Sequence, residues 1–413
     1  MLRRFNKLDV FTRNILVVFA GTTSVNFINF LFQLLIAHKL TPENFAAFNS
    51  LVALFIIISF AFGTIQTVIA KYAAEFSAAG SLNKVKFFYS DLLKKTSVIV
   101  LVTQVITLIF FPRLFTALKI NSPLTCVAFS VIFSTMWFLP VFLGFIQGFE
   151  LFKEQSVVTI IGGLLKLVLG FALVSLGFNV AGAMIALLIS QIICFIIFFF
   201  FLKEFLIFKA DHLDINYKEM FIFSLPVLVC TFSYSILIGS DMILVKYFFS
   251  PQDSGTYSLA QMVGKVFLFL PSAITIAMFP RINKLNAQKM DTLRTLKKSI
   301  FYMSVLCGFA FVCYFMAPSF FFKILTGKVN SESILLGKLF SFSMTLYSLV
   351  MVMMCYFFSL KDFRFMKYLV MLTFLQTFGI IFFHANLLMV QFILCASSFM
   401  LFLILLLLLR KKV

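Results

Sequence analysis

Residues 180–202 read VAGAMIALLISQIICFIIFFFFL and contain no charged side chain. A bilayer core about 30 Å thick needs roughly 20 mostly apolar residues for one α-helix to cross it. This stretch is long enough, so it predicts a membrane-spanning helix. The rest of the chain can be searched for runs of the same kind.

Further apolar runs of this length occur along the whole 413-residue chain, which is 62% hydrophobic and only 12% charged. A soluble protein needs about a quarter charged residues to cover its surface. This composition therefore excludes an ordinary soluble enzyme, a disordered chain and a secreted disulfide scaffold. We expect an all-α polytopic membrane protein with about 12 transmembrane helices and no soluble domain. The predicted spans are Ile15–Ala37, Phe45–Ile69, Thr96–Phe111, Pro123–Gly148, Val157–Leu176, Val180–Leu202, Met220–Val245, Tyr257–Phe279, Ser299–Phe322, Ser333–Phe358, Lys367–Phe383 and Leu387–Leu409.

The third predicted span, Thr96–Phe111, is the shortest. The longest polar stretches lie between spans, and we expect them to connect helices outside the bilayer. They are Lys71–Lys95, Lys203–Glu219 and Arg281–Lys298.

The net charge of +19 follows from where the basic residues lie. Lys and Arg favour the cytoplasmic ends of membrane helices. If the N-terminus is cytoplasmic, 25 of the 34 Lys and Arg residues lie on the cytoplasmic side, seven lie on the outer side, and two lie inside spans. We therefore expect a multi-pass protein of the inner or plasma membrane with both termini in the cytoplasm, and no nucleic acid partner.

An internal repeat divides the chain near its middle. Residues 41–48, TPENFAAF, resemble residues 250–257, SPQDSGTY, which lie 209 positions later. A weaker similarity links residues 148–152 with residues 360–365. We expect six-helix bundles over residues 1–206 and 207–413, related by an axis along the membrane normal as in many transporters. Similar loop chemistry without a true repeat is the alternative.

Polar side chains recur at helical spacing inside several spans, where each is costly in lipid and tends to face the protein interior. We expect them to line a cavity, the alternative being that they hold helices together. Three amides in the first span, at steps of three and four, exceed what packing needs. The predicted lining residues are Asn26, Asn29, Gln33, Thr231, Ser235 and Gln261.

Three ionisable residues inside spans are the strongest site candidates. Lys166 lies near the middle of its span, where a charged lysine costs roughly 2.5–3.5 kcal/mol, and Lys265 lies about a third of the way into its own. We expect both to bind an anion such as a phosphate or pyrophosphate, unless they form structural ion pairs or extend to the interface. Asp241 would couple transport to an ion, or else pair with Lys246 or Lys265.

Neither a cofactor nor a metal is predicted. The sequence has no glycine-rich phosphate loop, no Cys-x-x-Cys pair and only three scattered histidines. A membrane enzyme such as a polysaccharide polymerase or ligase would need a large outer loop to hold its active site, and the predicted outer loops are short. We therefore expect a transporter with no catalytic residues.

Several stretches, in the expected order along the chain, resemble bacterial polysaccharide flippases. These are the O-antigen and capsule repeat-unit exporters of the multidrug/oligosaccharidyl-lipid/polysaccharide (MOP) superfamily. In the first loop, Thr41 and Ala46 replace the usual glycines. The similar stretches are residues 40–45, LTPENF; 145–148, FIQG; 224–226, SLP; 241–245, DMILV; 250–260, SPQDSGTYSLA; 279–280, FP; and 317–327, from Ala-Pro to Leu-Thr-Gly.

The resemblance implies two six-helix bundles, as in multidrug (MATE) exporters of this superfamily, around a cavity that opens alternately to each side. It implies movement of undecaprenyl-pyrophosphate-linked oligosaccharides from the cytoplasmic to the outer leaflet for cell-surface polysaccharide biosynthesis. The partners would be the lipid-linked oligosaccharide, membrane lipids, and polymerase or glycosyltransferase machinery. The alternatives are a cation-coupled multidrug or metabolite exporter of the same superfamily and a lipid II flippase.

Overall fold

The computed structural model describes residues 10–206, 217–269, 274–275, 278, 281–282, 285–286, 288 and 290–410, and side chains from Val17 and, after the first gap, from Ser224. Every regular element in these ranges is a helix. The α-helices are α2 (Val10–Lys39), α3 (Pro42–Ala78), α4 (Leu82–Ala117), α5 (Pro123–Thr135), α6 (Phe138–Gly148), α7 (Phe152–Leu173), α8 (Asn179–Leu202), α9 (Tyr217–Phe248), α10 (Pro251–Phe269), α12 (Leu293–Met316), α13 (Pro318–Thr326), α14 (Ser331–Ser359), α15 (Met366–Phe382) and α16 (Leu387–Arg410).

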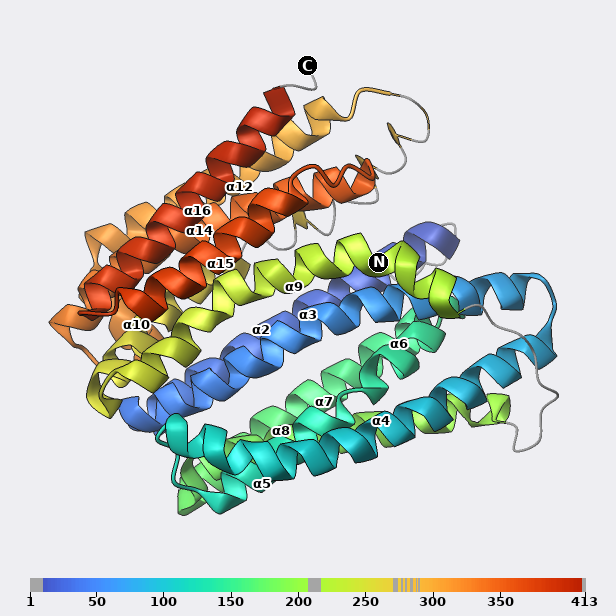
Figure 1. Ribbon diagram of the computed structural model, residues 1–413, viewed down its shortest axis with the longest axis horizontal. Helices are drawn as coiled ribbons and strands as arrows, with labels where there is room; N and C mark the ends of the chain where they lie inside the picture. The colour runs from blue at the N-terminus through green and yellow to red at the C-terminus, as the bar shows by residue number, and fades with distance from the viewer. Residues whose placement is uncertain are drawn as a thin grey trace, which may run out of the picture. The chain divides into compact units, whose positions relative to one another are not determined.

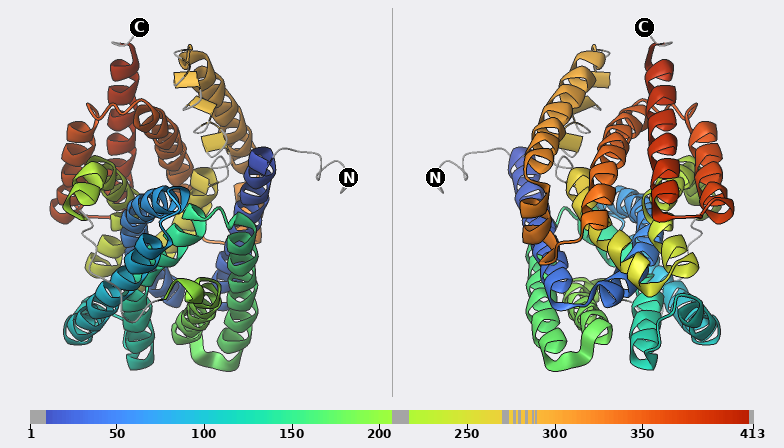
Figure 2. Two further views of the ribbon diagram at one scale, coloured as in Figure 1. Left: turned by 90° about the vertical axis from the view of Figure 1, so that its right-hand side faces the viewer. Right: turned by 90° about the vertical axis from the view of Figure 1, so that its left-hand side faces the viewer.

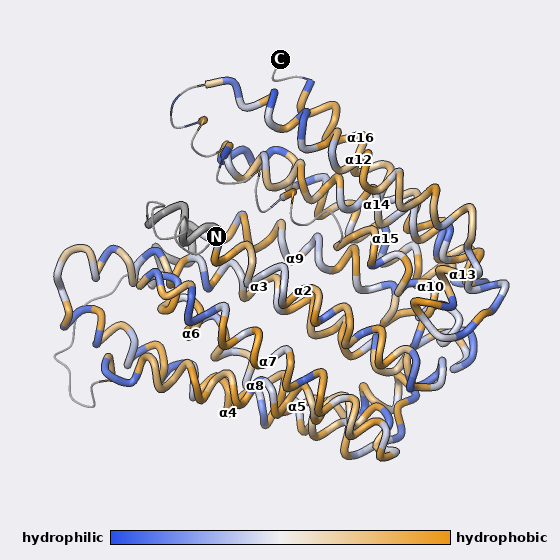
Figure 3. The backbone as a smooth tube through the Cα atoms, turned by 180° about the vertical axis from the view of Figure 1, so that it is seen from behind, coloured by the Kyte–Doolittle hydropathy of each residue, from blue (hydrophilic) through white to orange (hydrophobic). Residues whose placement is uncertain are grey.

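Nine helical segments of the described chain are long and apolar enough to cross a membrane. One of them, Phe152–Phe205, holds two predicted spans, α7 and α8, which are separated by a turn at Gly177. The shorter α15 and the described part of α10 occupy the remaining two predicted spans. The prediction of an all-α polytopic membrane protein is confirmed (Figure 1). Apolar residues fill the helices, and hydrophilic ones gather mainly near helix ends and loops (Figure 3).

The turn between α7 and α8 depends on one glycine. Gly177 has φ of 90°, a conformation that glycine adopts without the steric cost of a Cβ. It closes a hairpin in which α7 and α8 lie side by side, drawn in green in Figure 2.

Two predicted boundaries are wrong. The stretch Lys71–Lys95, expected to lie in a connection, is helical except for a short turn around Gly80. Exposed i,i+4 pairs support this helix on either side of the turn, with 3.8 Å between Lys71 and Glu75 and 2.8 Å between Asp91 and Lys95. As a result α4 has 36 residues and is much longer than the predicted span.

The other wrong boundary is the end of the ninth span, which was expected at Phe322. Instead α12 ends at Met316, and α13 starts at Pro318. The residue before a proline is disfavoured in helical conformation, so Pro318 ends one helix and begins the next.

The chain forms two compact units. The first comprises residues 1–39 and 58–228, and the second comprises residues 40–57 and 229–413. In the first unit α2 packs on α7, α7 on α8, and α4 and α8 on α5. In the second, α10 and α16 pack along α14, and α15 packs on α16. The start of α3 thus belongs to the second unit. The division into compact units does not show where each copy of the repeat ends. The six-helix bundles over residues 1–206 and 207–413 therefore stay a prediction.

The two copies of the repeat begin their helices in the same way. Thr41 and Ser250 are equivalent positions, and each is followed by a proline at the first helical position. The backbone N–H of Asn44 donates to the Thr41 hydroxyl at 3.3 Å, and that of Asp253 donates to the Ser250 hydroxyl at 3.1 Å. Both are N-caps, which satisfy a backbone donor that the helix leaves unpaired.

The weaker sequence similarity also has a structural counterpart. Glu150 follows α6 with φ of 57°, and Lys361 follows α14 with φ of 52°. The next N–H reaches back five residues in both cases, from Leu151 to the carbonyl of Ile146 at 2.9 Å and from Asp362 to that of Phe357 at 3.0 Å. This is the Schellman pattern of helix termination. The shared geometry at both places supports the internal repeat.

The two copies also contact each other. The Asn49 side-chain amide donates to the Ser258 hydroxyl at 2.7 Å, and both side chains are fully buried. These positions are separated by 209 residues, the spacing of the repeat, so they are counterparts. At the same contact, a Cβ on Gly255 would lie 2.9 Å from the carbonyl carbon of Pro42.

The close approach of Gly255 to Pro42 predicts that Gly→Ala is destabilising there, whereas the same substitution is stabilising at an open helical position such as Gly63. At Gly63 in α3 nothing lies within 4 Å of an added Cβ, so Gly63→Ala is expected to stabilise by about 1 kcal/mol through helix propensity. Gly255→Ala is expected to destabilise by about 1–3 kcal/mol, because the clash is with backbone. Thermal unfolding in detergent measures both. Equal effects of the two substitutions would contradict the close approach.

Candidate functional site

The ammonium of Lys166 on α7 contacts α2. It donates a hydrogen bond to the Asn29 side-chain oxygen and lies 5.2 Å from the centre of the Phe32 ring. Both interactions suit a cation, but neither supplies a negative charge. Among the residues that the structure describes, no carboxylate forms an ion pair with Lys166. Its charge is therefore solvated by the protein without being neutralised.

Two glycines explain why this lysine reaches α2. A Cβ on Gly163 would lie 3.1 Å from Ile28, and one on Gly170 would lie 2.5 Å from the Phe32 ring. Their absent side chains let the two helices approach closely. Lys166 lies three residues after one glycine and four before the other, so it shares their face.

Of the three predicted lining amides on α2, Asn29 is in contact with the lysine. Asn29 bonds to Lys166, Asn26 is exposed within the first unit, and Gln33 is partly exposed. Periodicity placed the three amides on one face, but only the structure shows which of them the lysine contacts. Their role in lining a cavity stays a prediction.

Asp241 on α9 is fully buried in the second unit. Its Oδ2 accepts hydrogen bonds from the Tyr257 hydroxyl at 2.9 Å and from the Gln261 side-chain amide at 3.0 Å, while no donor in the described chain reaches its Oδ1. Lys265, one turn beyond Gln261 on α10, interacts electrostatically with the carboxylate. Three α10 side chains at steps of four residues, Tyr257, Gln261 and Lys265, thus interact with Asp241.

Lys166 belongs to the first unit and Lys265 to the second. Neither unit by itself brings the two lysines together, and their joint role in one anion site stays a prediction.

The polar face of α9 packs against another helix. The Ser235 hydroxyl lies 3.0 Å from the Ile57 carbonyl oxygen and 2.7 Å from the Phe232 carbonyl oxygen of its own helix. A Cβ on Gly239 would lie 3.4 Å from the Ile57 side chain. Thr231, on the same face, is partly buried. Ser235 therefore takes part in helix packing here, and a cavity role for Ser235 and Thr231 stays a prediction.

A buried network in the second unit was not predicted. The Tyr347 hydroxyl on α14 lies 2.5 Å from the Gln376 side-chain oxygen on α15 and 2.8 Å from the Ser397 hydroxyl on α16. The Gln376 amide donates in turn to the Leu237 carbonyl of α9 at 2.8 Å. Glutamine within the apolar run of α15 was the available signal, but its partners come from other helices. No group of three or more His, Cys, Asp or Glu that could hold a metal ion occurs in the described part of the chain.

Residues 11–286 match the family model described as polysaccharide biosynthesis protein. The chain belongs to this family. The match covers the start of α2, the Lys166 and Asn29 pair, and the surroundings of Asp241. No curated protein matches this member of the family.

Solved structures establish the fold of this family member. An inward-facing multidrug resistance MATE transporter of the MOP superfamily has a TM-score of 0.71 at 14% identity, covering 94% of this chain and 95% of its own. The lipid II flippase MurJ, inward closed, has a TM-score of 0.75 at 14% identity, covering 96% and 87%. A MOP transporter from Pyrococcus furiosus has a TM-score of 0.61 at 13% identity, covering 97% and 94%. The prediction of a MATE/MOP-like fold is thereby confirmed.

The hydrogen bonds to Asp241 predict a loss of stability on removing the Tyr257 hydroxyl. Tyr257→Phe is expected to lower the free energy of unfolding by about 1–3 kcal/mol, because it takes a donor from a buried carboxyl group. In an Asp241→Asn background the loss should be smaller, since the two groups interact directly. Thermal unfolding in detergent tests this, with Tyr247→Phe as control because Tyr247 is 50% exposed. Additive effects would show that the two groups do not interact.

Proposed function

We propose that this protein is a flippase for lipid-linked oligosaccharides whose lipid carries a pyrophosphate. The observation that carries the proposal is Lys166, inside a predicted span, which contacts Asn29 and Phe32 and has no ion pair with a carboxylate among the described residues. A charged lysine inside a span costs a few kcal/mol, and an anionic ligand would offset this cost. Membership of the polysaccharide biosynthesis family and the MOP fold support the same substrate class.

In this proposal the lysine binds the pyrophosphate and the amides bind the sugar. The Lys166 ammonium acts as a point charge for phosphate oxygens, while amides such as Asn26 and Gln33 hydrogen-bond sugar hydroxyls. Alternating access then moves the head group from the cytoplasmic to the outer leaflet. The basic-residue distribution supports an inner-membrane protein with both termini in the cytoplasm. Glycosyltransferases would supply the substrate on the cytoplasmic side, and a polymerase would use the product on the outer side.

A cation-coupled exporter of drugs or metabolites is the second candidate. It rests on Asp241, a fully buried carboxylate with one oxygen that no described donor reaches. The same carboxylate would couple oligosaccharide transport to a proton or sodium gradient, so Asp241 does not by itself decide between the candidates.

Lys166→Gln is expected to reduce flipping by about tenfold or more, because a charge-assisted hydrogen bond contributes roughly 1.5–3 kcal/mol. The measurement is leaflet accessibility of a fluorescent undecaprenyl-pyrophosphate oligosaccharide in proteoliposomes. Lys166→Arg should retain part of the activity. Lys153→Gln, an exposed lysine at the start of α7, is the matched control. Equal activity of Lys166→Gln and wild type would refute the anion site, and drug transport without flipping would favour the second candidate.

Asp241→Asn tests coupling separately. In proteoliposomes without an ion gradient, it should flip at the wild-type rate. An imposed proton or sodium gradient should accelerate flipping by the wild type and not by the variant. The asparagine amide cannot exchange a proton, and it lacks the charge that attracts a cation. If the gradient accelerates both proteins equally, Asp241 has no coupling role.

A further inference from the structure

The outward face of α12 is basic at its N-terminal end and apolar further along. The opposite face is buried and includes Leu296, Met303 and Cys307. The outward face starts with Arg294, Lys297 and Lys298 and continues with apolar residues. The exposed apolar side chains include Phe301 at 63%, Val305 at 54% and Phe309 at 70%.

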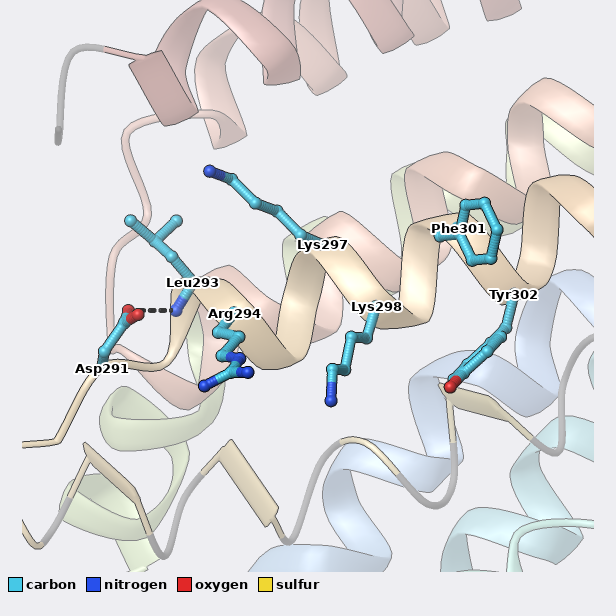
Figure 4. A pocket seen from close by; sticks show the side chains of 7 residues that line it. All are labelled: Asp291, Leu293, Arg294, Lys297, Lys298, Phe301 and Tyr302. Atoms are coloured by element: carbon cyan, nitrogen blue, oxygen red, sulfur yellow. Dashed lines mark hydrogen bonds between the residues drawn. The ribbon is translucent and has the colours of Figure 1, made fainter.

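The basic end of α12 lines a cavity of about 630 Å³. Arg294, Lys298 and Tyr302 extend from one side of the helix, and Lys297 and Phe301 from the other (Figure 4). None of the three cationic side chains forms an ion pair with a described residue. Asp291, the acidic residue among the described residues that line the cavity, accepts a hydrogen bond from the backbone N–H of Leu293 at 2.8 Å.

A second cavity, of about 220 Å³, lies further along the same helix, between α12 and α14. On α12 it is lined by Ser304, Cys307, Gly308 and Phe311, and on α14 by Phe342 and Thr345. The absence of a side chain at Gly308 leaves open space, since nothing lies within 4 Å of a Cβ added there.

One stripe of α12 joins the two cavities. Lys297, Phe301, Ser304, Gly308 and Phe311 follow one another at steps of four, three, four and three residues, which keeps them on one face of a helix. A ligand that fills both cavities would present an anion to the lysine end and an apolar chain to the glycine end.

We propose that this stripe binds one anionic phospholipid of the leaflet predicted to be cytoplasmic. The phosphate would lie at the basic end of α12, which carries Arg294, Lys297 and Lys298, and one acyl chain would enter the groove at Gly308. A phospholipid fits because basic residues beside a membrane helix attract anionic head groups. The apolar outward residues need hydrocarbon beside them, which a peptide or a soluble anion does not supply. The site is distinct from Lys166 and does not depend on the proposed function.

The site has a structural consequence. The first turn of α12 contains no acidic residue, and cations are unfavourable near the positive end of a helix. The phosphate would relieve this repulsion, so the lipid is expected to stabilise the start of α12 and to hold it at the interface.

The test compares the retention of phosphatidylglycerol and phosphatidylcholine by the full-length protein in neutral detergent, measured by native mass spectrometry. Wild type should retain phosphatidylglycerol preferentially. The triple variant R294Q/K297Q/K298Q should lose this preference by on the order of tenfold or more, since each cation adds to the attraction. K84Q/K94Q/K361Q removes three exposed charges from the same predicted side and should keep it.

A second variant separates a lipid from a free anion. Gly308→Phe fills the groove and leaves the basic residues in place. It should weaken phosphatidylglycerol retention while inorganic phosphate binding, followed by thermal stabilisation, stays unchanged. Equal retention by the two triple variants would overturn the site. Retention that is insensitive to Gly308→Phe and is displaced by phosphate would show a plain anion site.

Discussion

The hydrogen bond between Asn49 and Ser258 joins the two copies of the repeat at their counterparts. Both side chains are fully buried, and in a membrane protein neither finds water as an alternative partner. The nearby approach of Gly255 to Pro42 leaves little freedom for α10 to rotate. With Ser258 directed toward α3, its helix neighbours Tyr257 and Gln261 face α9 and meet Asp241. The polar centre of the second unit therefore depends on the contact between repeats.

Close helix packing has a similar effect in the first unit. Gly163 and Gly170 bring α7 against α2, and Lys166 lies between them on the same face. The lysine is thereby directed to Asn29 on α2. In both units, a helix contact through small residues determines where an ionisable side chain points, because membrane helices gain little from apolar burial and rely on close contact instead.

The net charge of +19 thus has components with different physical roles. Basic residues at helix ends are predicted to orient the chain in the membrane, and three of them, Arg294, Lys297 and Lys298, line a cavity at the start of α12. Lys166 and Lys265 lie within spans, each beside polar side chains of its own unit. Lys265 has a carboxylate near it, whereas Lys166 has an amide and an aromatic ring. This difference makes Lys166 the stronger candidate for an external anion.

The sequence by itself determined the all-helical membrane class and the spacing of polar residues along its helices. These properties depend on hydropathy, helical periodicity and local caps, which act over a few turns of one chain. Only the tertiary structure decided that the start of α3 joins the second unit, that Asn29 is the partner of Lys166, and that Tyr347, Gln376 and Ser397 form one network. Those contacts depend on the rotation and approach of helices distant in sequence, which follow from side-chain volumes across interfaces and have no signal along a single helix.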